Sequence, residues 1–399
     1  MDLSLLANQI INGLTLGGIY ALIAVGYTMV YGIIKLINFA HGEIYMMGCF
    51  AGILLIGQGV PFWVALPASM ILCALLGVVI DFVAYRPLRN APRLAGLITA
   101  IGVSLFLQNL AMLMWTASER PFPDLYPAFR IEATGDVRHR ETVLDEIALR
   151  LGERRDDEPR IDSVVREFGG SLRVEFVLGS RSMDGLRLVR QVRRSALVAL
   201  EARLPGLDVA VSEESLDHIL NRPALSFDLG GRRPVELRWK VVFIWAVTIV
   251  LMLGLEAVVH RTKVGTAMRA CALDKVTASL MGIDVNRIIA LTFAIGSAMA
   301  AAAGIMFAMY RGSGIGYRMG FHPGVIAFAA AVLGGVGNIR GAILGGVVLG
   351  VVQVAARAYV TDWLGINSNY AFAFAFGLLI LVILVRPTGL LGRARAERP

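Results

Sequence analysis

The sequence has few cysteines and few charges for its length. Cys49, Cys73 and Cys271 are far apart along the chain of 399 residues, and none has a CxxC or zinc-ligand spacing. Neither a disulfide framework nor a metal site is therefore predicted. Charged residues make up only 17% of the chain, hydrophobic residues make up 56%, and the mean hydropathy is +0.67. This composition is atypical of a soluble globular domain and predicts insertion into a membrane.

The charges that are present concentrate in one block. Between Glu119 and Lys240 lie 22 of the 30 acidic and 21 of the 38 basic residues, a net charge of −1. The rest of the chain has a net charge of +9, as expected when Arg and Lys mark the cytoplasmic ends of membrane helices. Because these basic residues fall in separate short loops, no nucleic-acid partner is predicted.

Two further absences narrow the possible functions. No GxxxxGK[ST] phosphate loop occurs, so ATP is expected to bind to another chain. Outside the charged block, Glu43, Asp81 and Glu256 lie near the expected ends of membrane helices, and no buried pair of acids is expected within a span. A proton-driven transporter would need such acids. The N-terminus lacks the basic region of a cleavable signal, so its apolar stretch is expected to stay in the membrane.

Apolar stretches that approach the roughly 20 residues needed to cross a bilayer occur on both sides of the block. They are 9–31, 44–59, 62–84, 97–115, 241–259, 288–309, a pair within 324–355, and 372–385. The pair is interrupted by the sequence GGVGN at 334–338, so it is either two short helices or one irregular element. The fold class predicted is a polytopic α-helical membrane protein with eight or nine transmembrane helices. Arginine-rich loops and tail on one side favour nine.

The block itself predicts an inserted, extracytoplasmic α+β domain at 128–229. It separates an N-terminal transmembrane part, 1–127, from a C-terminal transmembrane part, 230–399, which includes a basic cytoplasmic loop at 260–288. The block shows helical periodicity at 139–152 and 186–204 and strand-like patterns at 172–178 and 207–211. This strand–helix–strand order resembles one half of a porter subdomain of resistance-nodulation-division exporters, although βαβ units are common.

Small residues recur at every fourth position on several spans. Gly13 and Gly17 form one such pair, and Gly341 and Gly345 form another. In lipid this spacing lets helix backbones approach closely, since packing rather than water exclusion drives helix association there. The glycines therefore predict a tightly packed bundle.

Three polar residues cluster where the first span ends and the second begins. They are Asn38, His41 and Glu43. Ionisable groups at this depth usually face a protein interior or a water-filled cavity, which predicts a part in translocation or gating. The alternative is structural: Asn38 caps a helix and Glu43 places a favourable charge in its first turn. No second ligand has a suitable spacing to His41, so no metal is predicted.

Several stretches resemble one transport family. They are GLTLGGIYALIAVGYTMVYGII at 13–34, INFAHGE at 37–43, GTAMRACALDKVTASLMGIDVNRIIA at 265–290, AAAVLGGVGNIRGAILGG at 329–346 and RPTGLLG at 386–392. In this order they resemble the branched-chain amino acid permeases of ABC importers, over roughly 1–127 and 230–392. That family has only a short outer loop where this chain has its block.

The resemblance implies the function and the partners. It implies a permease subunit in the bacterial inner membrane that translocates branched-chain amino acids, with a second related permease subunit, two cytoplasmic ATPase subunits and a periplasmic amino-acid-binding protein. ATP and Mg would bind to the ATPase subunits, and no cofactor to this chain, which would touch membrane lipid. The rival hypotheses are a self-sufficient secondary transporter or exporter, and a non-transporting scaffold with a periplasmic recruitment domain.

The resemblance also implies a coupling role for the loop at 260–288. In ABC importers a short helix of this loop docks in a cleft of the ATPase, and here 267–281 is expected to form it, with Gly282 ending the helix. The candidate coupling residues are Arg269, Asp274, Gly282, Asp284 and Asn286. An ordinary solvated loop is the alternative.

Overall fold

The structure is a computed structural model of the whole chain. It describes residues 3–36, 38–58, 60–89, 91–123, 128–134, 161–168, 171–178, 208–213, 220–227, 234–312, 314–360, 365, 367, 370–386 and 388–392. The chain forms two compact units. The first comprises Met1–Gly52, Leu66–Phe122 and Pro223–Pro399 and is mainly helical, and the second comprises Ile53–Ala65 and Pro123–Arg222.

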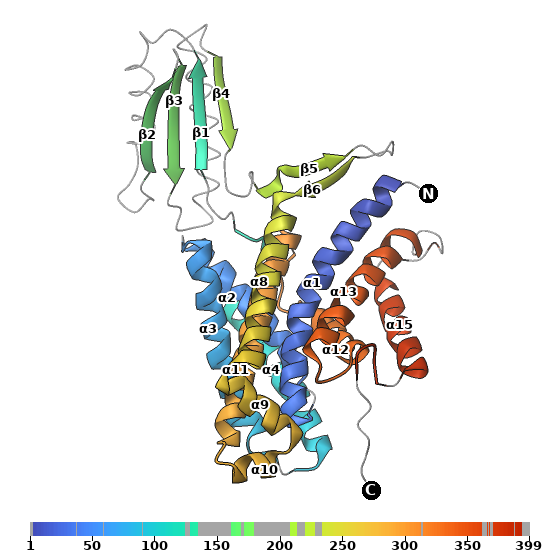
Figure 1. Cartoon of the computed structure of the whole chain (residues 1–399). Helices are drawn as coiled ribbons and strands as arrows, with labels where there is room; N and C mark the ends of the chain where they lie inside the picture. The colour runs from blue at the N-terminus through green and yellow to red at the C-terminus, as the bar shows by residue number, and fades with distance from the viewer. Residues whose placement is uncertain are drawn as a thin grey trace. The chain divides into compact units, whose positions relative to one another are not determined.

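Helices make up most of the described chain, as Figure 1 shows. They are α1 (Leu3–Ile34), α2 (Ala40–Gly57), α3 (Phe62–Ile80) with the π-helix η1 (Asp81–Tyr85), α4 (Arg93–Trp115), α8 (Trp239–Arg261), α9 (Lys263–Leu273), α10 (Lys275–Leu280), α11 (Val285–Arg311), α12 (Phe321–Gly334), α13 (Ile339–Ala355) with the π-helix η3 (Ala356–Val360), and α15 (Ala371–Val385).

A polytopic α-helical membrane protein is confirmed. Within the described residues, seven helices are long and apolar enough to cross a membrane, compared with the eight or nine predicted for the whole chain. The two others, α12 and α15, have 14 and 15 residues, fewer than the roughly 20 that a span requires. The split pair predicted within 324–355 is two helices, of which only α13, extended by η3, is long enough to span.

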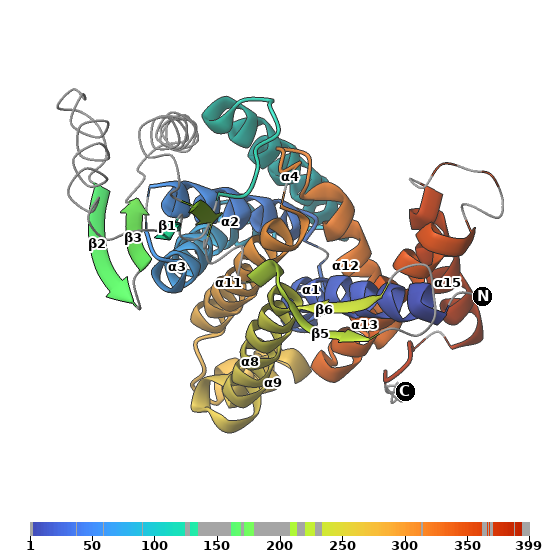
Figure 2. The ribbon, with the colours of Figure 1, turned by 90° about the horizontal axis from the view of Figure 1, so that it is seen from above.

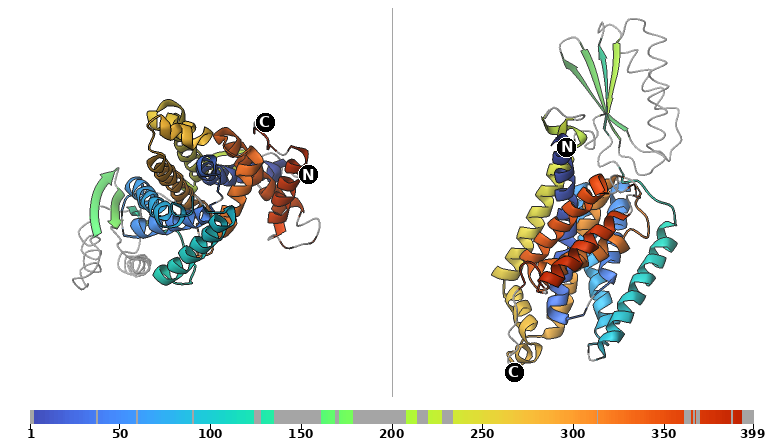
Figure 3. Two further views of the ribbon diagram at one scale, coloured as in Figure 1. Left: turned by 90° about the horizontal axis from the view of Figure 1, so that it is seen from below. Right: turned by 90° about the vertical axis from the view of Figure 1, so that its right-hand side faces the viewer.

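Helix α1 lies at the centre of the helical unit. It is apolar all round, and 89% of its most hydrophobic window is buried, against 28% for α8 and 22% for α4. A helix without a polar face belongs inside a bundle. Helices α11, α12 and α13 pack against it, whereas α4 lies at an edge in Figures 2 and 3.

The predicted glycines lie where helix backbones meet. A Cβ on Gly13 would stand 2.8 Å from the Cα of Val351, and one on Gly17 would stand 2.7 Å from the Cα of Val347, so α1 and α13 run antiparallel in direct backbone contact. On another face of α13, Cβ atoms on Gly341 and Gly345 would stand 2.2 and 2.1 Å from carbonyl oxygens of α12. No larger residue fits at these four positions without moving a helix.

A glycine-rich turn joins α12 to α13, and the C-terminal segment packs against it. Gly335 and Gly337 have φ angles of 103° and 88°, which only glycine adopts readily. Asn338 then caps α13 by accepting a hydrogen bond from the Gly341 N–H at 3.2 Å. The Leu391 N–H donates to the carbonyl of Gly334 at 3.0 Å, so the RPTGLLG stretch closes this end of the helix pair.

The second unit contains a four-stranded antiparallel sheet. Its strands are β1 (Ala128–Thr134), β2 (Ile161–Phe168), β3 (Ser171–Leu178) and β4 (Asp208–Glu213), in the order β2-β3-β1-β4 (Figure 1). Strands β3 and β4 match the predicted strands, and β1 and β2 were not predicted. Since both β3 and β4 pair antiparallel with β1, they are parallel to each other, as the split βαβ arrangement requires. The helices predicted at 139–152 and 186–204 lie outside the described residues.

A two-stranded sheet belongs to the first unit. It pairs β5 (Pro223–Phe227) with β6 (Val235–Arg238), and β6 runs directly into α8. The side chain of Asn8 in α1 donates to the Pro234 carbonyl at 3.2 Å and accepts from the Glu236 N–H at 3.3 Å. These bonds fix the start of α8 against the start of α1.

Candidate functional site

The predicted coupling loop folds as a helical elbow, residues 262–284, between α8 and α11. The single helix expected at 267–281 is wrong, because the elbow consists of two helices, α9 and α10, that meet at Asp274. Asp274 has extended backbone angles, ends α9 and caps α10 by accepting a hydrogen bond from the Val276 N–H at 2.9 Å. Aspartate favours such capping positions over helix interiors, which explains the break.

Hydrogen bonding also sets the ionisation of the elbow. The Thr277 hydroxyl donates to Asp274, and this bond together with the N–H groups of Val276 and Thr277 lowers the pKa of the carboxyl below its ordinary value. Partial burial, with the nearby Arg89 as a smaller cause, lowers the pKa of Lys275. The Lys275 ammonium lies 3.5 Å from the carbonyl of Ile34, at the end of α1. The elbow is therefore attached to the central helix.

The end of α10 has the glycine geometry that was expected. Gly282 has a φ of +82°, the Gly282 N–H donates to the Ser279 carbonyl, and the Ile283 N–H donates to the Ala278 carbonyl. These two bonds form a Schellman motif. Asp284 then caps α11 by accepting from two backbone N–H groups, those of Asn286 and Arg287, both at 3.1 Å.

The elbow leaves large apolar side chains uncovered. The most exposed are Leu273, Val276, Leu280 and Met281, with relative exposures of 75%, 70%, 82% and 79%. They lie among charged and polar residues rather than on an apolar span, and α9 and α10 lie at one end of the helical unit (Figure 1). We call these four exposed side chains the apolar patch of the elbow; large exposed apolar patches are typical of interaction surfaces.

Arg269 holds the elbow together. Its guanidinium donates to the carbonyl of Val259, at the end of α8, and to the Thr266 hydroxyl at 3.3 Å. A Cβ on Gly265 would stand 2.2 Å from the same Val259 oxygen, so α9 begins in direct contact with α8. The Arg269 side chain therefore stabilises the elbow from within, whereas the apolar patch is exposed.

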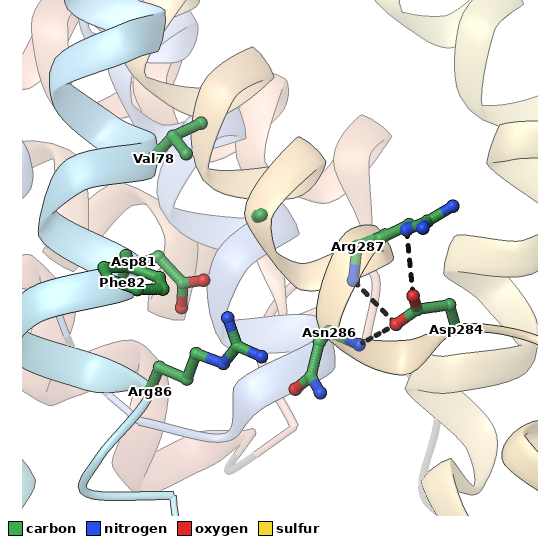
Figure 4. Close-up of a pocket in the computed structure, with 8 residues that line it drawn as sticks. Val78, Asp81, Phe82, Arg86, Asp284, Asn286 and Arg287 are labelled. Carbon is green, nitrogen blue, oxygen red and sulfur yellow. Dashed lines mark hydrogen bonds and ion pairs between the residues drawn. The ribbon is translucent and has the colours of Figure 1, made fainter.

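A polar pocket lies where α3 and η1 face the start of α11. Its volume is about 410 Å³, and Figure 4 shows its lining from the two elements. Asp81 is 2% exposed and accepts two hydrogen bonds from Arg89, at 2.8 and 2.9 Å. Arg89 also donates to the Asn286 side chain. Two predicted coupling residues, Asp284 and Asn286, therefore line this pocket.

The link from Asp81 through Arg89 to Asn286 was not predicted from the sequence. Asp81 was expected only to lie near a helix end, and no partner was expected for it. The two residues are eight apart along the chain, across a π-helix, so no helical i,i+4 spacing signalled the contact. Asp81 and Glu43, expected only near helix ends, are both buried, but each is a single acid and not half of an acid pair.

Asn38, His41 and Glu43 form a buried polar joint at the start of α2. Their exposures are 2%, 1% and 0%. The His41 ring lies against Gly26, eight residues or about 12 Å before the end of α1. The chain therefore turns back into the bundle after α1, and α2 begins beside the interior of α1 rather than at its end.

Each polar side chain of the joint is held by a neighbouring helix. Asn38 accepts a hydrogen bond from the Tyr85 hydroxyl at 2.8 Å, and the His41 ring meets the Tyr27 ring edge-on with centroids 4.6 Å apart. Glu43 Oε1 accepts from Ser104 and Gln108 of α4 at 3.1 and 2.7 Å. No cluster of three metal-ligating side chains occurs among the described residues.

Comparison with known proteins places the chain in a family. The family described as "Branched-chain amino acid transport system / permease component" matches residues 9–128 and 214–384, with 129–213 between the matched segments. The chain belongs to this family.

Similar proteins carry names of the same kind. The "High-affinity branched-chain amino acid transport system permease protein BraD" of Pseudomonas aeruginosa is 37% identical, covering 98% of this chain and 97% of that protein. The permease protein LivH of the same kind of system in Escherichia coli is 35% identical, covering 98% and 96%. The corresponding protein LivM of Escherichia coli is 24% identical over 58% of this chain and 50% of its own length. No solved structure was found to match the chain.

Proposed function

We propose that this chain is the transmembrane permease subunit of an ABC importer, and that it translocates branched-chain, aliphatic amino acids across the bacterial inner membrane. The relatives BraD and LivH, named as high-affinity branched-chain amino acid permeases, support this proposal across nearly the whole chain. The chain supplies the membrane path and has no ATPase site of its own. ATP and Mg bind to partner ATPase subunits.

The exposed apolar patch of the elbow is the main structural support for an ATPase partner. A self-sufficient transporter has no use for a protruding pair of short helices that exposes Leu280 and Met281 beside charged residues. An ATPase partner covers this patch, and closure of the ATPase pair on ATP moves it. The elbow is attached to α1 by Lys275, and the first turn of α11, which follows the elbow, is attached to η1 by way of Asn286, Arg89 and Asp81. Movement of the patch therefore reaches the membrane helices.

The remaining partners follow from the family. A second, related permease subunit completes the path, and the LivM relative supports this, because a second kind of permease with similarity to this chain exists. A periplasmic amino-acid-binding protein delivers the cargo. Exposed apolar side chains on α3, α4 and α8 meet lipid or the second permease.

The sheet of the second unit is an insertion on the periplasmic side. The basic residues Arg86, Arg89, Arg261 and Lys263 flank the ends of α3 and α8 and mark the cytoplasmic side. The segment between α4 and α8 then lies on the opposite side, where the binding protein docks. We assign it a role in that docking.

Two experiments test the proposal. The tagged protein, extracted in mild detergent from its host, is expected to co-elute with two ATPase subunits and a second permease. Right-side-out vesicles are expected to take up radiolabelled leucine only with the binding protein outside and ATP inside. Uptake driven by an ion gradient without ATP would establish the secondary transporter instead, and no uptake with no co-eluting ATPase would establish the scaffold.

Removal of the insertion separates its role from that of the permease. Replacing 129–213 by a short Gly-Ser linker leaves β5 and β6 in place, so the start of α8 stays fixed. Uptake at saturating binding protein is expected to persist, whereas the concentration of binding protein required for half-maximal uptake is expected to rise. An unchanged concentration dependence would show that the insertion has no part in docking.

A further inference from the structure

The polar joint contains a buried carboxylate oxygen that has neither a hydrogen-bond donor nor a cation beside it among the described residues. Glu43 is fully buried, and its Oε1 is held by Ser104 and Gln108. Among the described residues, none donates a hydrogen bond to its Oε2 and no basic side chain forms a salt bridge with it. Taking a carboxylate out of water costs several kcal/mol unless a cation or hydrogen-bond donors replace the water, and without them the group takes up a proton. The free oxygen therefore identifies a place that a cationic group would stabilise.

This oxygen lies at a seam made of glycines. Oε2 stands 2.3 Å from the position of a Cβ on Gly320, directly before α12. Next to it, a Cβ on Gly42 would stand 2.5 Å from the Gly320 carbonyl oxygen and 2.8 Å from the Cα of Gly324. At Gly42, Gly320 and Gly324, the start of α2 and the start of α12 therefore meet backbone against backbone, with the Glu43 side chain lying against Gly320. Separation of the two helices at these glycines would uncover Oε2.

Both helices begin inside the bundle. Helix α2 starts beside the interior of α1, and Gly320, which directly precedes the 14-residue α12, lies against the first turn of α2. Secondary transporters commonly bind their cargo where the ends of broken helices meet near the middle of the membrane. The two helix starts do not themselves make a site. The buried, unpartnered oxygen aimed at their seam is the observation that requires a ligand.

We infer that Glu43 is a cargo-binding residue, and that its Oε2 accepts the α-ammonium group of the amino acid as α2 and α12 part. This rests on the proposed function, in which the cargo is an amino acid. The ammonium supplies the missing positive charge through a charge-assisted hydrogen bond. Ser104 and Gln108 hold the carboxylate in place, so it does not need to reorganise when the cargo arrives. An aliphatic carboxylic acid without the amino group would lack this interaction.

The test compares two replacements of Glu43 in the assembled importer, reconstituted with its ATPases, its partner permease and binding protein, with leucine as the probe. Glu43→Gln keeps the shape and an acceptor for Ser104 and Gln108 but removes the charge. Glu43→Asp keeps the charge but shortens the side chain. The matched control is Glu236→Gln at the exposed Glu236 of β6. Uptake is measured per assembled complex, quantified by co-elution.

The inference predicts at least tenfold less uptake for Glu43→Gln, a partial return of uptake for Glu43→Asp and none of this loss in the control. If Glu43 only packs and accepts hydrogen bonds, Gln replaces it better than Asp does. Uptake by Glu43→Gln would then exceed uptake by Glu43→Asp. A reversed order, wild-type uptake in Glu43→Gln, or a loss explained entirely by loss of assembled complex would overturn the inference. If the wild-type importer shows no ATP-dependent leucine uptake, the proposed function fails, and the inference falls with it.

Discussion

The ion pair between Asp81 and Arg89 can be broken by replacing either residue. We expect replacement of Arg89 to destabilise the helical unit more than replacement of Asp81. The Asp81 side chain is 3% exposed and that of Arg89 is 15% exposed. Arg89→Ala leaves a buried carboxylate without its only ion-pair partner among the described residues, at a cost of about 3–5 kcal/mol. Asp81→Asn leaves an arginine that still donates to Asn286 and reaches water, so about 1–2 kcal/mol is expected.

The double variant Asp81→Asn with Arg89→Ala closes a thermodynamic cycle. Since the severe cost of Arg89→Ala arises from the unpaired carboxylate, adding Asp81→Asn should restore part of the stability, with a coupling of about 1.5 kcal/mol or more. The free energy of unfolding is measured by SDS titration of the purified protein in mixed micelles. Additivity of the two changes within about 0.5 kcal/mol would refute the pairing.

Three further predictions concern α1 and the elbow. Gly17→Val, whose Cβ would stand 2.7 Å from a backbone atom of α13, should lower stability by about 1–3 kcal/mol or prevent folding, whereas Gly254→Ala, with open space around it, should not; thermal unfolding distinguishes them. Leu280→Asp removes no packing, so stability should change by less than about 0.5 kcal/mol while ATPase co-elution is lost. Hydrogen bonds lower the pKa of the Asp274 carboxyl below its ordinary value of 3.8. The carboxylate therefore caps α10 fully at neutral pH, and this cap is lost as the pH falls through the folded-state pKa. At pH 7, Asp274→Ala should speed the exchange of backbone amide hydrogens in α10, whereas Asp274→Asn, which can still cap the helix, should not.

The sequence predicted most of the helices because each span has its own local signal. Hydropathy located the full spans, and the GGVGN stretch marked the turn between α12 and α13. Local chemistry also predicted that Gly282 ends a helix. It did not predict the break at Asp274, since aspartate is compatible with a solvated helix face as well as with a cap. In the folded chain Asp274 accepts hydrogen bonds from Thr277 and Val276 and so caps a new helix, and these bonds could not be predicted from the sequence.

The depth of a residue in the bundle was much harder to predict. Hydropathy places Glu43 and Asp81 at span ends, because it measures distance along the chain and assumes that each helix begins at the membrane surface. The reentry of the chain after α1 breaks that assumption and carries Glu43 inward. Asp81 is tolerated only because Arg89 comes back to it from the following loop. Tertiary pairing of this kind leaves no periodic pattern in the sequence.

The elbow and the seam are connected by continuous structure. Asn286, in the first turn of α11, accepts a hydrogen bond from Arg89, which lies four residues before α4. Helix α4 then carries Ser104 and Gln108 to Glu43, and α11 runs on to Gly304, whose Cβ would stand 2.2 Å from the carbonyl oxygen of Tyr45 in α2. A displacement of the elbow that shifts the first turn of α11 is therefore expected to act on the carboxylate through both α4 and α2. Movement of a docked ATPase would then separate α2 from α12 through α4, whose Ser104 and Gln108 hold Glu43. ATP and the cargo would not need to touch each other.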